Sequence, residues 1–383
     1  SIVNPIQPLV VSMAASGDTS VNDSEDKVFV RLDDVRKFIK EAIELSGLRT
    51  SYAELQAKVL VDADCKGKTS HGLGLLHMIL LNISEGSIVD SEPVVLHETV
   101  GSAWLDGQGC LGAVVGSFAI KKAIEKAAQN GIGWVTAKGS HHLGSLEWFS
   151  MQACQQGMIG LCMSNTWPAS VVPGSKQRVL GTNPICLAAA GLDGDYLLFD
   201  SALTVTAMRK VKEKTRSGDG SVPEGWGVDQ NGQPTTDGAS ILNNGALLPL
   251  GGISPLTGGH KGFGLILLVE VLTSVLAGSA FSSDIGKKDA ESGVFVGKDF
   301  GQTFIAIDPS HFGGGFSDRL QFLLDYCRHL EPVDESNPVK MPGERGRLNS
   351  QRAHKDGGLW YSKQLIHQMN DWMKKLGGDF MLQ

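Results

Sequence analysis

The sequence lacks the cysteine spacing of a zinc module or of a disulfide scaffold. Its six cysteines are scattered over 383 residues, and no two of them form a CxxC pair. A chain of this length buries a core large enough to be stable without disulfides. We therefore expect reduced thiols, a cytoplasmic location and no metal site.

A basic surface and long apolar runs are also missing. The 34 Lys and Arg residues are outnumbered by 41 Asp and Glu residues, which gives a formal net charge of −7. This acidic balance argues against nucleic acid as a partner. The longest apolar stretch, residues 263–281, carries Glu270 and two glycines. No segment is therefore expected to span a membrane.

Residues 1–26 contain no arginine and no helical stripe. They lack the basic, acid-poor composition of a mitochondrial transit peptide. They also lack the basic start and apolar centre of a secretory signal. We expect this segment to be a disordered tail.

Glycine is abundant, with 48 residues where about 7% of a chain is usual. The glycines alternate with apolar segments and form no repeats, which indicates tight turns in an α/β protein. Helical stripes cover Val35 to Ile43 and Ser51 to Lys66, and a last amphipathic helix covers 360–375 after an extended segment at 333–345. Between them, strands are predicted at 100–106, 131–137, 159–164, 185–190, 196–200 and 303–308, and helices at 111–129, 146–156 and 263–280. This alternation predicts a sheet covered by helices.

Gly107, Gly109 and Gly112 form a G-x-G-x-x-G pattern between a predicted strand and a predicted helix. That context is required of a Rossmann dinucleotide-binding turn. The next predicted strand, however, ends in Lys138 and Gly139, where an acidic ribose ligand belongs. The alternative is a glycine turn that packs a helix closely on a strand.

Histidines lie in three turns, TSHG at 69–72, GSHHLG at 139–144 and GGHKG at 258–262. Histidine is suited to proton transfer near neutral pH, so these turns are candidates for acid/base chemistry. A solvated turn residue is the alternative for each. Neighbours such as His141 and His142 point to opposite faces of an extended chain, so we expect one of them to face a pocket and neither to bind metal.

Polar pairs also follow predicted strands, at Thr182–Asn183 and at Asp200–Ser201. The carboxyl ends of buried strands are common ligand sites, although capping a helix is an equally simple role for Asp200. Lys261 precedes the apolar helix, whose N-terminal N–H groups can bind a phosphate. Exposure to solvent is the alternative for this lysine.

Taken in order, these segments resemble the malate/L-lactate/sulfolactate dehydrogenase family, which includes ureidoglycolate dehydrogenase and diketogulonate reductase. The resemblance covers about residues 28–375. The matching segments are SHG at 70–72, DGQGCLGAVVG at 106–116, SHHLG at 140–144, SNT at 164–166, GTNP at 181–184, LFDSA at 198–202, PEGWGVDQNGQPTTD at 223–237, GGHKGFGL at 258–265, FIAIDP at 304–309 and MPGER at 341–345.

The resemblance implies a non-Rossmann, mixed-sheet α/β fold that binds NAD or NADP, with NAD slightly favoured. It implies a homodimer, an active site near the subunit boundary and a small carboxylate substrate. In this fold a helical segment, 27–100, packs with a C-terminal segment, 320–383. The NAD(P)-binding domain is 101–319, and its Gly- and Pro-rich residues 212–257 are expected to be an irregular connection.

The same resemblance assigns site residues by position. His142 and His71 map to the catalytic histidines. Cofactor contacts map to Asn165, Thr166, Asp200, Ser201, His260, Lys261, Gly343, Glu344 and Arg345. Substrate contacts map to Ser70, His141, Thr182 and Asn183, with His141 in a place often held by Asn.

The chemistry of ketone reduction is consistent with these roles. Hydride delivery creates an alkoxide, which a histidine of pKa near 6.5 can protonate. We expect His142 to be the acid/base and His71 to orient the substrate or share the proton relay, and the opposite assignment stays open.

Family members commonly carry arginines shortly after SHG, where they suit bidentate capture of a carboxylate. Leu75 and Met78 occupy those places here. Either His77, Arg209 or Arg345 binds the acid, or the substrate differs from malate and lactate. The sequence thus predicts an NAD(P)-dependent 2-hydroxyacid oxidoreductase, with a catalytically impaired dinucleotide-binding protein and a Rossmann dehydrogenase as alternatives.

Overall fold

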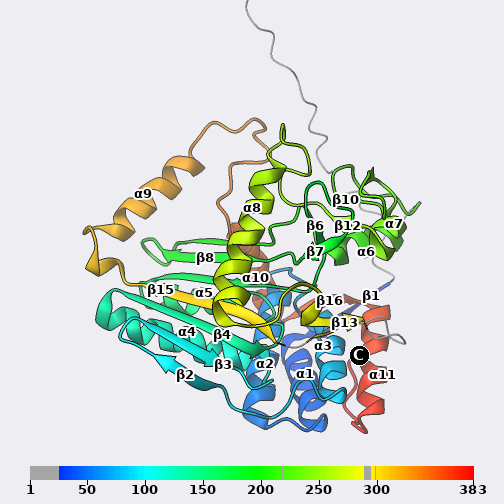
Figure 1. Cartoon of the computed structure of the whole chain (residues 1–383). Helices are drawn as coiled ribbons and strands as arrows, with labels where there is room; N and C mark the ends of the chain where they lie inside the picture. The colour runs from blue at the N-terminus through cyan, green and yellow to red at the C-terminus, as the bar shows by residue number, and fades with distance from the viewer. Residues whose placement is uncertain (1–25, 217–218, 289–294, 298) are drawn as a thin grey trace, which may run out of the picture.

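The computed structural model describes residues 26–216, 219–288, 295–297 and 299–383. The predicted disordered tail lies outside the described residues, apart from Asp26. Figure 1 shows a central sheet with helices against it, and a group of helices built from both the early and the late part of the chain. The fold therefore joins segments that are far apart in the sequence.

The central sheet has seven described strands in the order β2-β3-β4-β15-β5-β8-β9. Strands β3 and β4 run parallel, and the other neighbouring pairs are antiparallel. A Rossmann sheet is parallel. The predicted mixed sheet is therefore confirmed, and the Rossmann alternative is wrong. The strands are β2 (Val94–Glu98), β3 (Ser102–Asp106), β4 (Ile132–Ser140), β15 (Phe300–Ile307), β5 (Ile159–Ser164), β8 (Ile185–Ala190) and β9 (Tyr196–Ser201).

The glycine pattern that follows β3 is a packing turn at the start of α4 (Gly112–Asn130). A Cβ atom at Gly107 would lie 2.8 Å from the carbonyl oxygen of Gly139, and one at Gly112 would lie 2.4 Å from that of His141. Gly109 has a φ of 72°, which disfavours other residues. The turn thus brings the beginning of α4 against the loop that carries the predicted catalytic histidine.

Helices α4 and α5 (Glu147–Cys154) cover the sheet at close range. A Cβ atom at Gly133 of β4 would lie 1.9 Å from the carbonyl oxygen of Ala123, and one at Gly160 of β5 would lie 2.2 Å from that of Ser150. Because glycine has no side chain, each helix backbone can approach a strand closely. The phenyl rings of Phe149 on α5 and Phe304 on β15 meet edge to face, with centroids 5.8 Å apart.

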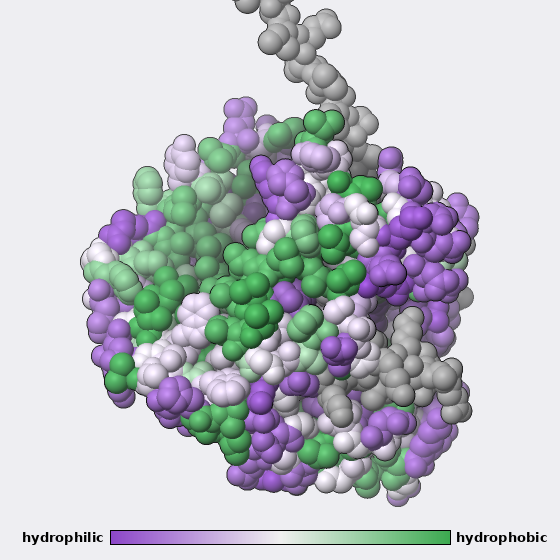
Figure 2. Space-filling view, in the orientation of Figure 1, coloured by the Kyte–Doolittle hydropathy of each residue, from purple (hydrophilic) through white to green (hydrophobic). Residues whose placement is uncertain are grey.

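Helix α8 (Gly259–Glu270) continues into a π-helical turn, Val271–Val275, so the predicted helix at 263–280 is not uniform. Many of its apolar side chains are exposed, and Figure 2 shows apolar side chains gathered over α8 and toward α9 (Phe316–Arg328). In the described part of the chain, no helix is long and apolar enough to cross a membrane.

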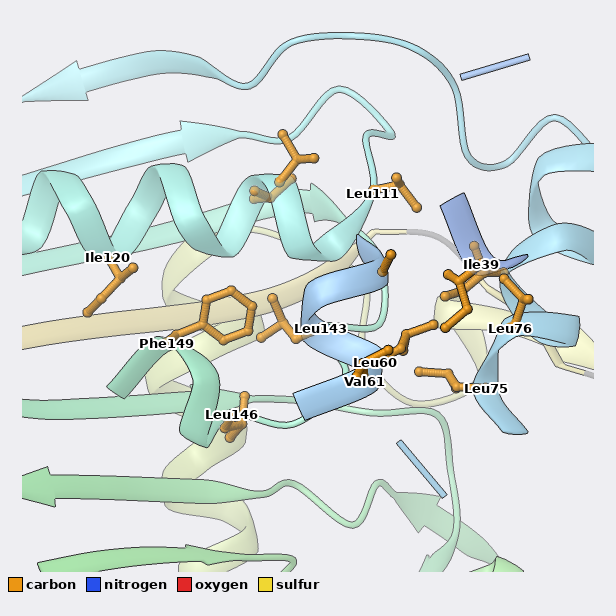
Figure 3. Close-up of a cluster of buried hydrophobic side chains, with 14 of the residues drawn as sticks. Ile39, Leu60, Val61, Leu75, Leu76, Leu111, Ile120, Leu143, Leu146 and Phe149 are labelled. Carbon is orange, nitrogen blue, oxygen red and sulfur yellow. The ribbon is translucent and has the colours of Figure 1, made fainter. Parts of the chain in front are cut away.

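The helical group contains α1 (Leu32–Leu45), α2 (Thr50–Cys65) and α3 (Leu76–Ser84). The predicted stripe of α1, from Val35 to Ile43, is buried. Figure 3 shows Ile39 and Leu60 in the same cluster of buried side chains as Leu143 and Phe149, so that the helical group and the sheet share a core. Apolar burial across this boundary holds the two parts together.

Both ends of the described chain meet in a two-stranded sheet. Strand β1 (Lys27–Arg31) pairs antiparallel with β16 (Gly358–Ser362). The last helix, α11, therefore runs over Lys363–Lys375 and does not begin at Trp360, which pairs as a strand residue. Ser362 caps α11 by accepting a hydrogen bond from the Leu365 amide at 3.2 Å. The segment predicted to be extended, 333–345, runs into α10 (Glu344–Asp356), so its last two residues are helical.

Residues 212–257, expected to be irregular, contain short ordered elements. They contribute β10 (Gly227–Val228), β11 (Pro234–Thr235) and β12 (Ala246–Leu247) to a five-stranded sheet with β6 (Ser170–Val171) and β7 (Arg178–Leu180). A small apolar cluster supports this sheet. The remaining elements are α6 (Met208–Arg216), α7 (Gly238–Asn243), β13 (Gly286–Lys288), β14 (Phe295–Gly297) and the 3-10 turns η1 (Leu73–Leu75), η3 (Ser282–Ile285) and η4 (Pro309–His311).

The close approach of α4 to β4 predicts the effect of a single methyl group. Gly133→Ala places Cβ against the carbonyl oxygen of Ala123 and should lower the free energy of unfolding by about 1–3 kcal/mol. Gly264→Ala on α8 is the control, because its Cβ meets open space and alanine favours a helix. Thermal and denaturant unfolding measure both, and equal stabilities for the two variants would contradict the packing argument.

Candidate active site

Two histidines that are distant in the sequence lie side by side. His71 belongs to the turn between α2 and η1, and His142 belongs to the loop between β4 and α5. Their ring centroids are 5.6 Å apart, with an angle of 40° between the ring planes. The indole of Trp167 lies on His142, at 5.8 Å between centroids. The fold thus brings both predicted catalytic imidazoles to one place.

Hydrogen bonds orient the two imidazoles differently. The Gly144 amide donates to Nδ1 of His142 at 3.0 Å, so the neutral ring carries its proton on Nε2. Gly144 makes this turn with a φ of 81°. Nδ1 of His71 is hydrogen-bonded to the Ser70 hydroxyl at 2.7 Å. His142 is therefore fixed as a donor through Nε2, whereas Nε2 of His71 can either donate or accept.

Burial dominates the electrostatics of the pair. It lowers the pKa of His71 to about 4, with Asp200 raising the pKa and the cations Lys68 and Arg209 lowering it further. Burial, and then the charge of His71, lowers the pKa of His142 to about 3. Both rings are therefore neutral at pH 7, and a neutral imidazole is the form that accepts a proton from a hydroxyl group.

A buried ion-pair network supports the His71 turn. The Lys68 ammonium group donates to the carboxylate of Asp200 at the end of β9, to Oε2 of Glu147 at 2.8 Å and to the Ser145 hydroxyl at 3.2 Å. The Ser145 hydroxyl also donates to Asp200 at 2.9 Å. Burial lowers the pKa of Lys68, but the two carboxylates outweigh it and hold the pKa well above the usual value. The Asp200 side chain, predicted to contact a cofactor, is therefore occupied by Lys68.

Sequence reasoning missed Lys68 and Glu147. The available signal was Asp200 itself, because a carboxylate at the end of an apolar strand needs a buried cation or hydrogen-bond donors. The cation lies 132 residues earlier in the chain, and the sequence offers many lysines. Only the fold identifies the partner.

A second buried polar cluster surrounds the Glu270 carboxylate on α8. Nδ2 of Asn165 donates to its Oε1 at 3.1 Å, and Nδ2 of Asn183 donates to its Oε2 at 2.6 Å. Ser274 also donates to Oε1, at 2.6 Å. The asparagines predicted to contact cofactor and substrate thus hold their loops to α8. The available signal for Glu270 was its position as a charge within the apolar stretch 263–281.

The predicted hydroxyl residues lie next to this cluster. The hydroxyls of Thr166 and Thr182 are 3.3 Å apart, and the Thr182 amide donates to the Thr166 hydroxyl at 2.9 Å. Ser201 donates to the carbonyl of its neighbour Ala202. These half-buried hydroxyls retain capacity to bind a ligand.

The remaining predicted cofactor residues lie at the starts of two helices. His260 and Lys261 are exposed in the first turn of α8. Gly343 precedes α10 with a φ of 95°, and a Cβ there would lie 2.7 Å from that of Leu198. Glu344 accepts a hydrogen bond from Arg328 at 2.5 Å, whereas Arg345 is exposed.

A small pocket opens beside His142. Its lining is mostly apolar and is formed by Met78, Ile79, Asn82, Ile88, Leu111, Gly112, His141, His142, Trp167 and Phe300. His141 is buried, and its Nε2–H donates to the carbonyl oxygen of Ser87 at 2.6 Å. Leu75 and Met78 are buried, so these positions contribute no cation to the site.

The exposed donors suit a dinucleotide. An exposed lysine in the first turn of a twelve-residue helix, at the positive end of the helix dipole, suits a phosphate. Arg345 and the threonine hydroxyls suit phosphate or ribose groups. The side chains of Asn165, Asn183, Asp200 and Glu344 are engaged with protein groups. Among the described residues, no three His, Cys, Asp or Glu side chains gather to hold a metal ion.

Comparison with known proteins identifies the family. The sequence model described as malate/L-lactate dehydrogenase matches residues 30–370. The chain belongs to the malate/L-lactate dehydrogenase family. The resemblance predicted from the motifs is therefore confirmed, and with it the assignment as an oxidoreductase of the dehydrogenase class.

Relatives and solved structures of this family match almost the whole chain. Malate dehydrogenase of Pyrococcus horikoshii is 34% identical over 92% of this chain and 97% of its own. Ureidoglycolate dehydrogenase (NAD(+)) of Escherichia coli K12 is 32% identical over 84% and 90%. The structure of sulfolactate dehydrogenase from Methanocaldococcus jannaschii matches with a TM-score of 0.82 at 32% identity, over 92% and 98%.

The Lys68 network predicts a large stability effect for this member of the family. Lys68→Met leaves the Asp200 carboxylate without a cation and Glu147 with Lys66 alone, at 3.5 Å, and should lower the free energy of unfolding by about 3 kcal/mol. Lys40→Met is the matched control, because Lys40 bonds Glu54 on the surface and should change stability little. Denaturant unfolding at pH 7 compares them, and similar effects would show that the buried network does not support the fold.

Proposed function

We propose that the protein transfers a hydride between a nicotinamide cofactor and a small 2-oxo or 2-hydroxy acid. The observation that carries the proposal is the adjacency of His71 and His142, two neutral buried imidazoles 5.6 Å apart. Relatives named malate dehydrogenase and ureidoglycolate dehydrogenase (NAD(+)) support the substrate class and favour NAD over NADP. All six cysteines are free thiols, which supports the cytoplasmic location.

The cofactor, when bound, supplies or receives the hydride. In the oxidation direction, Nδ1–H of His71 donates to Ser70, and Nε2 takes the proton of the substrate hydroxyl. In the reduction direction the same nitrogen returns a proton to the developing alkoxide. His142 donates through Nε2, because the Gly144 amide occupies its Nδ1. We thus assign proton transfer to His71 and substrate orientation to His142.

Lys261, His260 and Arg345 are the side chains that we assign to the phosphates of the cofactor. Thr166, Thr182 and Ser201 carry hydroxyls for its sugar or amide groups. Asn165, Asn183, Asp200 and Glu344 act through the loops that they hold in place. The cofactor site is thus formed by the ends of strands and the beginnings of helices, as in other open α/β sheets.

Dinucleotide binding without turnover is the second candidate function. It is favoured by Leu75 and Met78, which leave the pocket beside His142 without a cation. A screen of malate, lactate, sulfolactate, ureidoglycolate and cyclic imino acids with NAD and NADP separates the candidates. Efficient oxidation or reduction of one of these compounds eliminates the second candidate, and failure to bind NADH or NADPH eliminates both.

The roles assigned to the two histidines predict different rates for their variants. His71→Asn should lower kcat about 10²- to 10⁴-fold, and His142→Asn should lower it less. In the oxidation direction, wild-type activity should be lost as the pH falls through the pKa of His71, because the protonated ring cannot accept the hydroxyl proton. His354→Asn, on the exposed face of α10, is the control. Quenching of protein fluorescence by NADH checks that cofactor binding persists, and an unchanged kcat in His71→Asn refutes the role.

We also propose that the protein forms a homodimer through its apolar face. Val275 and Leu276 after α8 are 58% and 51% exposed, and Phe322 and Tyr326 on α9 are 72% and 60% exposed. Figure 2 shows this apolar face over α8. A face of this kind on one chain is typical of a protein–protein interface.

Light scattering coupled to size exclusion tests the homodimer. Val275→Glu should convert the dimer to a monomer, because the new carboxylate would be buried without a partner. Leu45→Glu at the end of α1 adds the same charge on a different surface and should remain dimeric. A monomeric wild-type protein at micromolar concentration rules out the interface.

A further inference from the structure

A substrate carboxylate requires a cation with free N–H donors. The pocket beside His142 is lined by apolar side chains, among them Met78, Trp167 and Phe300. Two cations act on His71 from outside that pocket, namely Lys68 and Arg209. The choice between them follows from their hydrogen bonds.

Lys68 has no donor left for a ligand. Its ammonium group has three N–H bonds, and these are taken by Asp200, Glu147 and Ser145. Two carboxylates also neutralise its charge. Lys68 is therefore part of the framework that holds the histidine turn.

Arg209 is differently placed. It extends from the start of α6, and its Nε donates to Oε1 of Glu213 at 2.7 Å. Its Nη1 lies directly over Gly74, where a Cβ atom would be 2.3 Å away. Within the described residues, Nη1 and Nη2 donate to no acceptor. The glycine therefore makes room for a guanidinium group that presents two free donors beside the His71 turn.

The charge of Arg209 also acts on the titratable groups around the His71 turn. It contributes to lowering the pKa of His71 and of His77, and it acts on the buried Asp64 carboxyl. Four groups face His71 from the surrounding elements: Lys68 in its own turn, Asp200 on β9, Arg209 on α6 and His142 in the β4–α5 loop. Of these four, Arg209 is the cation with donors to spare.

The other two cations considered from the sequence fit less well. His77 is hydrogen-bonded to the Gly74 carbonyl at 2.8 Å, and burial lowers its pKa, so it is neutral at pH 7. Arg345 is exposed on α10, and we assign it to the phosphates of the cofactor. Arg209 is therefore the candidate that remains.

We propose that Arg209 binds the carboxylate of the substrate through Nη1 and Nη2, with Gly74 providing the space for the guanidinium group. The proposal rests on the proposed function and names the residue that selects acids in that site. It explains how a chain with Leu75 and Met78 after its SHG turn accepts a carboxylate. Neutralisation of Arg209 by a bound acid would also remove a charge that opposes protonation of His71.

Steady-state kinetics with pyruvate or oxaloacetate, whichever the wild-type protein reduces faster, tests the assignment. Arg209→Met should raise KM for the acid about 10- to 100-fold, while KM for NADH and kcat change less than about threefold. Arg209→Lys should lie between, because it keeps the charge and loses the two-point contact. Arg216→Met, at the exposed end of α6, is the matched control and should leave KM unchanged.

Two further measurements separate binding of the carboxylate from a structural role. The wild-type protein should prefer the acid to its methyl ester, and Arg209→Met should lose that preference, because the ester carries no charge to bind. Gly74→Ala should displace the guanidinium group and raise KM for the acid while Arg209 is still present. This variant serves if Arg209→Met does not fold.

The outcomes are distinct. An unchanged KM for the acid in Arg209→Met overturns the assignment, as does an increase in KM for NADH of the same size, which would place Arg209 at the cofactor. A wild-type protein that binds NADH but converts neither these two acids nor any compound of the substrate screen overturns the proposed function itself. The inference about Arg209 fails with it.

Discussion

The ammonium group of Lys68 makes the contact on which the arrangement of the candidate active site depends. Its side chain joins the helical group to β9 through Asp200 and to α5 through Glu147. Its backbone carbonyl accepts the amide of His71 at 2.8 Å. The residue that docks the helical group on the sheet therefore also fixes the turn that carries the imidazole. Burial of the two carboxylates makes this contact strong, because a buried charge depends on its partners.

Glu270 fixes the loops on the other side of the candidate site, as Lys68 fixes the turn that carries His71. It holds Asn165 after β5 and Asn183 before β8 to the same helix. Asn183 has a φ of 38°, a strained value that its hydrogen bonds maintain. Both clusters use buried polar groups to fix loops, and the apolar pocket with its histidines lies beside these loops. The rigidity of the site comes from residues that need not touch a ligand.

The patterned parts of the fold could be predicted from the sequence, and the long-range partners could not. The stripe of α1 and the alternation from β3 to β9 follow from apolar spacing, which is local. The start of α11 was misplaced because Trp360 pairs with Phe29, a residue at the other end of the chain. The short strands of residues 227–247 are too brief to show a period. The two histidines were identified because SHG and SHHLG match segments of the family, whereas one lysine among many gives no such signal.

The pairing of β1 with β16 has a consequence for the biosynthesis of the enzyme. The Tyr361 hydroxyl on β16 donates to Asp64 at 2.8 Å, and the same carboxylate oxygen accepts the Leu73 amide at 2.7 Å, just after the SHG turn. Tyr361 is translated 297 residues after Asp64. The hydrogen bond from β16 to the Asp64 carboxylate, which also holds the start of η1, can therefore form only after residue 361 has been synthesised.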